Sequence, residues 1–390
     1  MQRISVTPRT NLDARAKETG FEFATIDGQP YWDERSYYGF SLSQIERDIE
    51  APTGELHDLC LKLAARIIAD DTLLTRLAIP SHAWPLIRAS HTRGEPSLYG
   101  RLDLSYDGKG PAKLLEYNAD TPTALFEASV FQWLWLEDLR SDHVLPTEAD
   151  QYNSLHEALI ERFKAIKAFH TKASDLHLAC DPDSTEDKGL IAYLEDCAFQ
   201  AGFDTATFGI ADVGTHGKGP FVDLDDAPVH LMFKLYPWEW MFADTFSRSP
   251  SMLETRFIEP PWKAVLSTKG ILPLLWEMAP NHPNLLESYF EDDPRAKRLG
   301  DRYVRKPLYS REGSNVTIVD GVFTLDGEKG PYDSGGFVRQ AIAPLPEFAG
   351  NYPVIGSWIV GDKACGMGVR EDTTMITRNT SRFIPHAILP

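Results

Sequence analysis

The sequence predicts a mixed α/β protein, and two stretches carry that prediction. Residues 176–210 contain a strand pattern, a helix with its apolar side chains on one face, and a second strand pattern, which is the order of a βαβ unit. Gly202 follows this helix at a position where a left-handed cap forms easily. A later stretch has four short strand patterns joined by glycine-bearing loops, which indicates a small subdomain: 303–308, 315–319, 322–325 and 337–340.

The flanking parts of the chain complete the prediction. Residues up to about 98 are predicted to be mainly helical, with a buried stripe formed by Leu61, Leu63, Ala64, Ile67 and Ile68. Near the C-terminus, strand patterns at 354–360 and 364–369 are separated by Gly361-Asp362, which predicts a hairpin. We find no internal repeat, low-complexity tract or long linker, and therefore expect one body whose parts contact each other closely.

Charge and composition restrict the partners. The 390 residues include 39 Lys and Arg against 57 Asp and Glu, a formal net charge of −18. Neutralising phosphate requires clustered basic residues, so this balance argues against binding to nucleic acid or to an anionic membrane. Cationic partners are expected to be tolerated better.

The compartment follows from the cysteines and the apolar runs. Cys60, Cys180, Cys197 and Cys365 form no C-x-x-C pair and are too few to staple a chain of this length, so we expect reduced thiols and a cytoplasmic protein. The first residues lead into polar ones and do not resemble a secretory signal. No apolar run approaches the roughly 20 residues that a membrane span needs.

A predicted hairpin gathers the most informative polar side chains. Strands at 99–105 and 113–118 enclose the turn residues 107–110. Because side chains alternate along a strand, Arg101 and Asp103 share one face, and a turn over 107–110 brings Asp103 near Glu116 and Arg101 near Asn118. Two carboxylates and an amide oxygen are ligands that Mg²⁺ accepts together with waters and substrate phosphates. A hairpin whose charged face simply meets solvent is the alternative.

The segment after the hairpin predicts an anion site. Thr121 is expected to cap a helix, with Pro122 in its first turn, that continues through Leu136 and is buried. The free N–H groups of such a helix start would attract an anionic substrate group. Thr121 and Thr123 could equally serve in capping alone.

Three cations elsewhere are candidates for the same site. Lys269 precedes an apolar helical run, and Lys306 lies in a strand because the residue before proline avoids the helical region. Arg370 follows two glycines at alternate positions, which leave room for a ligand. The turn 310–315 carries a glycine that lets the backbone approach a ligand, but it is not a Walker A loop. Each of these residues, taken singly, could also be an ordinary surface cation.

Taken together, the motifs resemble the synthetase part of the glutathionylspermidine synthase and trypanothione synthetase family, and especially stand-alone bacterial proteins related to it. The resemblance spans roughly residue 21 to the end. Residues 114–123, Leu-Leu-Glu-Tyr-Asn-Ala-Asp-Thr-Pro-Thr, are its most specific part. The other motifs that carry it lie at 99–103, 132–135, 269–273, 303–307 and 368–370.

The resemblance implies an ATP-grasp fold with a pre-ATP-grasp βαβ region and a small lid. The implied domains are residues 1–266 with the metal-binding hairpin, a lid at 267–341, and strands at 342–390 that return to the core. The implied cofactors are ATP and Mg²⁺. The implied roles are Mg²⁺ binding by Asp103, Glu116 and Asn118, ATP binding by Lys269, Lys306, Glu312, Gly313 and Gln340, steadying of the reacting carboxyl group by Arg101 and Arg370, and peptide recognition by Thr121 and Thr123.

The activity expected from these residues is ATP- and Mg²⁺-dependent ligation of an acid to an amine through an acyl phosphate. That reaction needs charge neutralisation and positioning rather than a covalent side chain, which suits a sequence without a G-x-S-x-G motif. Glu239, flanked by aromatic residues, is the candidate for amine recognition, although it could instead border a core aromatic cluster. Glutathione and a polyamine are the substrates that the resemblance suggests.

Two rival functions remain open at this point. One is a non-catalytic nucleotide-binding protein with the same fold. The other is phosphate transfer to an acid without amide formation.

The resemblance has two departures. The loop 310–315 follows the sequence of the stand-alone relatives, whose substrate the resemblance does not define, and the other departure concerns an additional domain. The bifunctional family members carry an additional N-terminal amidase, for which this sequence has no room.

Overall fold

The centre of the molecule is an antiparallel sheet built from two distant parts of the chain. The computed structural model describes residues 1–26, 28–332 and 335–390. The core sheet has the order β21-β20-β19-β5-β6, with bounds Arg382–Ile384, Lys363–Asp372, Tyr352–Val360, Tyr99–Ser105 and Lys113–Asn118. Both predicted hairpins are confirmed, and β19 pairs with β5, so the C-terminal strands lie directly beside the polar hairpin.

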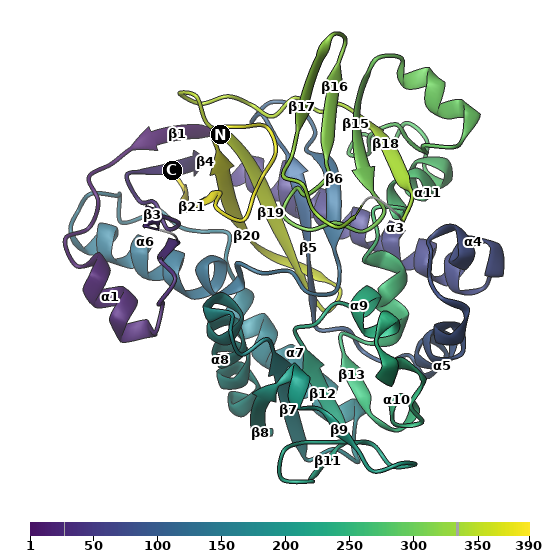
Figure 1. Ribbon diagram of the computed structural model, residues 1–390. Coiled ribbons are helices and arrows are strands. Elements are labelled where there is room, and N and C mark those ends of the chain that lie inside the picture. The colour runs from purple at the N-terminus through teal and green to yellow at the C-terminus, as the bar shows by residue number, and fades with distance from the viewer. Residues whose placement is uncertain (27, 333–334) are drawn as a thin grey trace.

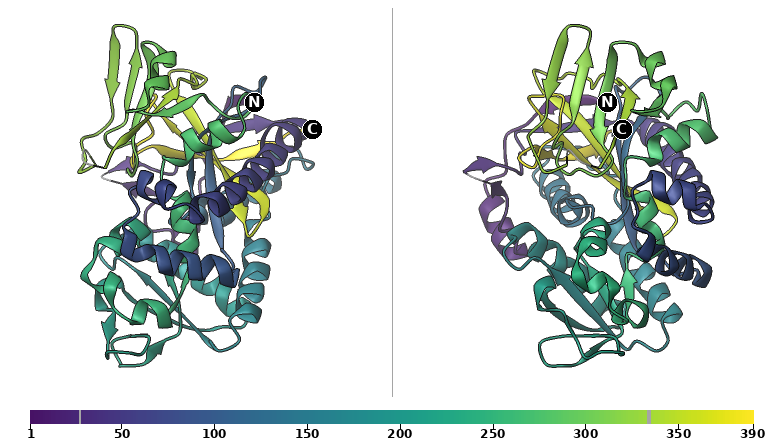
Figure 2. Two further views of the ribbon diagram at one scale, coloured as in Figure 1. Left: turned by 90° about the vertical axis from the view of Figure 1, so that its right-hand side faces the viewer. Right: turned by 45° about the vertical axis from the view of Figure 1, so that its right-hand side comes forward.

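A second antiparallel sheet, the lid sheet, stands at one end of the molecule (Figure 1). Its order is β14-β18-β15-β16-β17, with bounds Ser288–Phe290, Phe337–Ala341, Arg302–Pro307, Thr317–Asp320 and Phe323–Asp326. The four strands predicted between 303 and 340 are therefore confirmed, and β14 was not predicted. Both views of Figure 2 show these light green strands at the opposite end from the teal part of the chain.

The teal part is a parallel sheet of order β13-β12-β7-β8, with bounds Arg256–Ile258, Leu231–Lys234, Asp175–Cys180 and Asp204–Gly209. Helix α8, Thr185–Gln200, connects β7 to β8, and Gly202 lies beyond it at φ +91°. The predicted βαβ unit is thus confirmed. The interior residues of β7 are buried, as expected for a parallel strand covered on both faces.

Helices on both faces of the core sheet decide which side chains are exposed to the site. Helix α3, Ala51–Ile68, contacts β19 and β20, and its buried stripe belongs to the same apolar cluster as Leu102 and Leu104. Helix α7, Leu155–Phe169, also contacts β19 and β20 but shares a second cluster with Trp358. Because side chains alternate, Arg101 and Asp103 point away from α3.

The remaining elements are short. The remaining α-helices of the described ranges are α1 Leu12–Thr19, α2 Leu42–Gln44, α4 Asp71–Arg76, α5 Trp84–Arg93, α6 Gln132–Ser141, α9 Trp238–Ala243, α10 Ser251–Glu254 and α11 Ile271–Met278. The remaining strands are β1 Gln2–Ser5, β2 Thr25–Ile26, β3 Gln29–Pro30, β4 Ser36–Phe40, β9 Gly214–Thr215, β10 Phe221–Val222, β11 Pro228–Val229 and β22 His386–Ile388. Within the described ranges, none of the helices combines the length and apolar character that a bilayer crossing requires.

Two expectations need correction. The first 40 residues are not mainly helical, because β1 and β4 pair with each other there. The helix expected to start at Thr121 starts at Leu125 instead: residues 121–124 are not helical, and Ala124 adopts a left-handed φ of +64°. After Leu125 and Phe126 the helix continues as a π-helix, η3, over Glu127–Phe131. Thr121 therefore caps no helix. The division at residues 266 and 341 stays a prediction.

Candidate active site

The hairpin of β5 and β6 brings the predicted polar side chains together. Asp103 lies opposite Glu116, and Arg101 lies opposite Asn118. The Asn118 amide donates to Oδ2 of Asp103 at 3.0 Å and to Oε1 of Glu116 at 3.4 Å. The convergence that strand alternation predicted is therefore confirmed.

The pKa values of the two carboxylates of this hairpin are shifted in opposite directions. Burial raises the pKa of Asp103, and the negative charge of Glu116 adds to that rise, although Arg101 opposes it. Burial would also raise the pKa of Glu116, but the charges of Lys269 and Lys306 outweigh it and lower that pKa below the ordinary value. Opposed shifts of this kind in neighbouring acids are typical of functional sites.

Lys306 reaches the hairpin from β15 of the lid sheet, and Lys269 reaches it from the loop before α11. Nζ of Lys269 lies 3.2 Å from Oε2 of Glu116 and donates to the Ser310 carbonyl at 2.8 Å. Nζ of Lys306 donates to the Leu115 carbonyl at 2.8 Å and to Oε1 of Gln340 at 2.7 Å. Burial and the nearby Lys269 charge lower the pKa of Lys306 to about 8, although Glu116 opposes the shift.

A cavity of about 210 Å³ lies between the lid sheet and the core sheet, and we call it the lid cavity. Asp103, Glu116, Lys269, Lys306 and Gln340 line it, together with Glu312 and Gly313. The rest of its wall is mostly apolar: Leu115, Val304, Val316, Ile318, Ala341, Ile342, Ala343, Pro344, Leu345, Val354, Met375 and Ile376. The sequence analysis missed this apolar wall, whose only local signal is the run 341–345 at the end of a strand.

Gly313 is required where the lid loop meets the C-terminal strands. Its φ is +70°, and a Cβ atom there would lie 2.6 Å from Cγ2 of Ile376 and 2.6 Å from the Thr377 carbonyl oxygen. The close approach holds Glu312 at the cavity wall, where burial raises the pKa of its carboxyl.

The two candidate arginines line one small cavity of about 30 Å³, the arginine cavity, together with Asp103. Arg101 donates to both oxygens of Asp103, at 2.7 and 3.1 Å, and to the Thr123 carbonyl at 2.7 Å. Nη2 of Arg370 donates to carbonyls of the loop 378–381. Its Nε is buried and has no hydrogen-bond partner within the part of the chain that the structure describes.

Arg311 joins the residues that were expected to recognise substrate. It donates to Oγ1 of Thr121 at 3.0 Å and to Oε1 of Glu239 at 2.9 Å, and its guanidinium lies over the Trp240 ring. Thr121 and Glu239 line a third cavity of about 40 Å³ with Glu116 and Lys269, the amine-side cavity. Thr123 contributes its backbone carbonyl to Arg101 and does not line this cavity.

A buried ion pair supports this loop from behind, and the sequence analysis missed it. Nζ of Lys234 lies 2.9 Å from Oδ1 of Asp120, whose Oδ2 accepts from the Trp238 backbone N–H at 2.7 Å. Both side chains are at most 2% exposed. The pair therefore ties the loop after β6 to the start of α9, which carries Glu239. The one available signal was Asp120 within the Asn-Ala-Asp-Thr-Pro-Thr string.

The three cavities adjoin one another. The lid cavity shares Asp103 with the arginine cavity and shares Glu116 and Lys269 with the amine-side cavity. The cavity between the two sheets thus meets an arginine-lined pocket and a pocket lined by both acidic and basic side chains at one polar centre. The fold and its relatives define the class as a carboxylate–amine ligase with the ATP-grasp fold.

The chain belongs to the family described as "Glutathionylspermidine synthase preATP-grasp", whose sequence profile matches residues 3–389. A Haemophilus influenzae protein named "Putative acid--amine ligase" is 42% identical over 406 aligned positions, which cover 100% of each chain.

More distant relatives are longer proteins. The trypanothione synthetase of Crithidia fasciculata is 28% identical over 84% of this chain, and the bifunctional glutathionylspermidine synthetase/amidase of Escherichia coli is 26% identical over 93% of it. The chain spans 53% and 61% of their lengths.

The solved structure of a glutathione synthetase-like effector from Globodera pallida has the same overall fold. It superposes with a TM-score of 0.61 at 13% identity, covering 97% of this chain and 96% of that one.

Proposed function

We propose that the protein joins an acid to an amine in an ATP- and Mg²⁺-dependent reaction that passes through an acyl phosphate. The observation that carries the proposal is the opposed pair of Asp103 and Glu116, which lies where the three cavities meet and faces two lysines. Acyl phosphate formation requires neutralisation of phosphate charge at such a centre.

The lid cavity is the proposed nucleotide site. Its aliphatic wall suits a planar base, and Lys269 and Lys306 are positioned to contact phosphates next to the hairpin. The roles proposed for Glu312, Gly313 and Gln340 are those of wall residues around the same nucleotide.

Mg²⁺ is expected at the hairpin because the donor chemistry fits. The Asn118 amide lies within hydrogen-bonding distance of both Asp103 and Glu116, and Mg²⁺ typically takes one or two carboxylates plus substrate phosphates. The described ranges contain no cluster of three His, Cys, Asp or Glu side chains, so phosphate and water must complete the coordination. When bound, the ion would offset phosphate charge.

The proposed chemistry then uses the arginine cavity. Arg101 and Arg370 orient the carboxylate of the acid, one of whose oxygens attacks the γ-phosphorus of ATP while the bond to the β-phosphate oxygen breaks and ADP leaves. The amine nitrogen attacks the acyl carbon, the C–O bond to phosphate breaks, and the nitrogen loses a proton. The products are an amide, ADP and inorganic phosphate.

The amine is expected to approach from the amine-side cavity. Oε2 of Glu239 is buried there without a hydrogen-bond partner in the described structure, so it can accept from an ammonium group. The names of the relatives favour a peptide carboxylate such as glutathione and a polyamine such as spermidine as substrates. The four free cysteines favour a cytoplasmic protein.

Product analysis tests the proposal. Purified protein with ATP, Mg²⁺, glutathione and spermidine is expected to release ADP and to form a product whose mass is the sum of the two substrates less one water. ADP release with the acid alone would establish phosphate transfer instead. ATP binding without turnover across a wider panel of acids and amines would establish a non-catalytic nucleotide-binding protein.

A further inference from the structure

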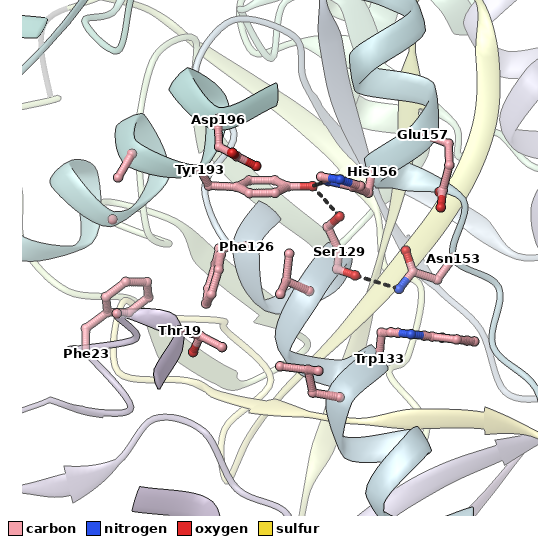
Figure 3. A pocket seen from close by; sticks show the side chains of 15 residues that line it. Thr19, Phe23, Phe126, Ser129, Trp133, Asn153, His156, Glu157, Tyr193 and Asp196 are labelled. Atoms are coloured by element: carbon pink, nitrogen blue, oxygen red, sulfur yellow. Dashed lines mark hydrogen bonds between the residues drawn. The ribbon is translucent and has the colours of Figure 1, made fainter. Parts of the chain in front are cut away.

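A large cavity lies on the opposite side of η3 from the reaction centre. It has a volume of about 640 Å³ and is formed by residues of α6, α7, α8 and η3 and by the segment after α1 (Figure 3). Small-molecule sites commonly have volumes of roughly 300–1,000 Å³. The cavity is therefore large enough to enclose a small organic ligand.

Aromatic side chains form much of its wall. Trp133, Tyr193, Phe23 and Phe126 line it, and Trp133 keeps 38% of its surface exposed. In the view of Figure 3, Trp133 lies on one side, and the Tyr193 and His156 rings lie on the other. Aromatic faces of this kind attract organic cations as well as apolar bodies.

The charged residues of the wall have one sign. Glu157 and Asp196, both solvent-exposed, line the cavity, and its described lining residues include no lysine or arginine. Asp196 accepts one hydrogen bond from Gln200 at 2.8 Å, and the structure records no ion pair of either carboxylate within the described residues. An anionic ligand is therefore disfavoured here, and a cation is favoured.

A fixed hydrogen-bond network holds the polar part of the wall in place. Oγ of Ser129 contacts the Tyr193 hydroxyl at 2.5 Å, and that hydroxyl contacts Nδ1 of His156 at 3.2 Å. The Asn153 amide donates to the Ser129 carbonyl at 2.9 Å. These contacts join η3, α7 and α8, so the cavity is preformed between three elements.

We propose that this cavity binds a small organic cation, namely a primary ammonium group on an apolar or aromatic body. The ammonium group is placed toward Glu157 or Asp196, and the body contacts Trp133 and Tyr193. The site is distinct from the three cavities of the reaction centre, since it shares no lining residue with them.

The cavity nevertheless adjoins the reaction centre through η3. Ser129 and Val130 of η3 line the cavity, whereas Glu127 at the start of η3 accepts from the Tyr31 hydroxyl at 2.6 Å. The guanidinium of Arg370 lies 6.0 Å from the Tyr31 ring. An occupant thus contacts the element that also supports the arginine cavity.

Calorimetric titration of the whole protein with 2-phenylethylammonium tests the proposal, with the uncharged 2-phenylethanol as the matched probe. We expect the ammonium to bind at least about tenfold more tightly than the alcohol, because two carboxylates and aromatic faces act together. The double variant Glu157→Gln with Asp196→Asn is expected to weaken ammonium binding by about tenfold or more. Ala192→Phe, at an exposed wall position of α8, is expected to abolish it by filling the cavity.

Two control variants test whether carboxylates outside this cavity contribute to binding of the probe. Glu161→Gln removes an exposed carboxylate one turn along α7, and Glu239→Gln removes the acid of the amine-side cavity; both are expected to change the affinity by less than about twofold. Loss of binding in Glu239→Gln alone would place the probe in the reaction centre and overturn the proposal. Equal affinity of the alcohol, unchanged affinity in the double variant, or no binding of 2-phenylethylammonium or n-hexylammonium would overturn it as well.

Discussion

Two groups of buried charges in this protein differ in how their partners are arranged. Glu259 and Lys263 form an ion pair at 2.8 Å with side chains at most 1% exposed, and Glu259 also accepts the backbone N–H groups of Leu98 and Tyr99. Asp103 and Glu116 are carboxylates that face each other, keep 14% and 28% of their side chains exposed, and line cavities.

The first group is structural, and the second is the group proposed to take part in the chemistry. Each carboxylate oxygen of Glu259 has a hydrogen-bond partner in a backbone N–H group or in Lys263. Glu259 lines none of the cavities described above, so its charge stabilises the junction between the parallel sheet and β5. The hairpin acids lie side by side with like charge and line cavities; Asp103 is paired with Arg101, and Glu116 lies 3.2 Å from the Lys269 ammonium group. Only the second arrangement leaves room for a metal ion and phosphate.

The largest effect is expected from Glu116→Gln. This change keeps the shape of the side chain but removes the charge that the proposed metal site needs, so we expect kcat/KM to fall by about 100–1,000-fold. Thermal unfolding should shift by only a few degrees because the side chain lines a cavity. The matched control is Asp107→Asn at the tip of the same hairpin, which should stay within about twofold of the parent in steady-state assays of ADP release.

Glu259→Gln is expected to lower the stability of the protein while leaving its activity largely intact. Removing one member of a buried ion pair leaves Lys263 uncompensated and costs about 3–5 kcal/mol of unfolding free energy. Chemical denaturation measures this loss, and the remaining folded protein should keep its turnover number within about threefold. A loss below about 1 kcal/mol, together with a large drop in turnover, would mean that the structural and chemical groups have been assigned the wrong way round.

The smallest effect concerns pH. Because the pKa of Lys306 is lowered to about 8, this ammonium is mostly protonated at pH 7 and mostly neutral at pH 9. Apparent ATP affinity should therefore fall by about tenfold as the pH rises from 7 to 9, since only the charged form attracts phosphate. Lys306→Arg keeps its proton throughout and should flatten the profile. Equal slopes in both proteins would exclude Lys306 as the titrating group.

Local sequence patterns predicted the hairpin of β5 and β6, because side-chain alternation along the strands and the short turn allow few other registers between them. The same kind of reasoning failed at Thr121. Cap and proline signals favoured a helix there, but the Arg101 hydrogen bond to the Thr123 carbonyl holds the segment in a non-helical conformation, and the helix begins only after the left-handed Ala124.

The sequence also could not pair Thr121 with Glu239. Their bridge, Arg311, lies far from both along the chain. Long-range partners of this kind depend on how the lid sheet is placed over the core sheet, which no local pattern contains.

By itself, the sequence determined the strands of the two hairpins, four strands of the lid sheet, the βαβ unit, the face shared by Arg101 and Asp103, and the family, because these depend on residue spacing within short segments. The tertiary structure decided that β19 pairs with β5, that Lys269 reaches Glu116 while Lys306 reaches the neighbouring Leu115 carbonyl, and that three cavities meet there. It alone also created the aromatic cavity beside η3. The physical reason is that cavities and charge pairs form between segments distant in the chain, where packing and desolvation of the whole molecule select the contacts.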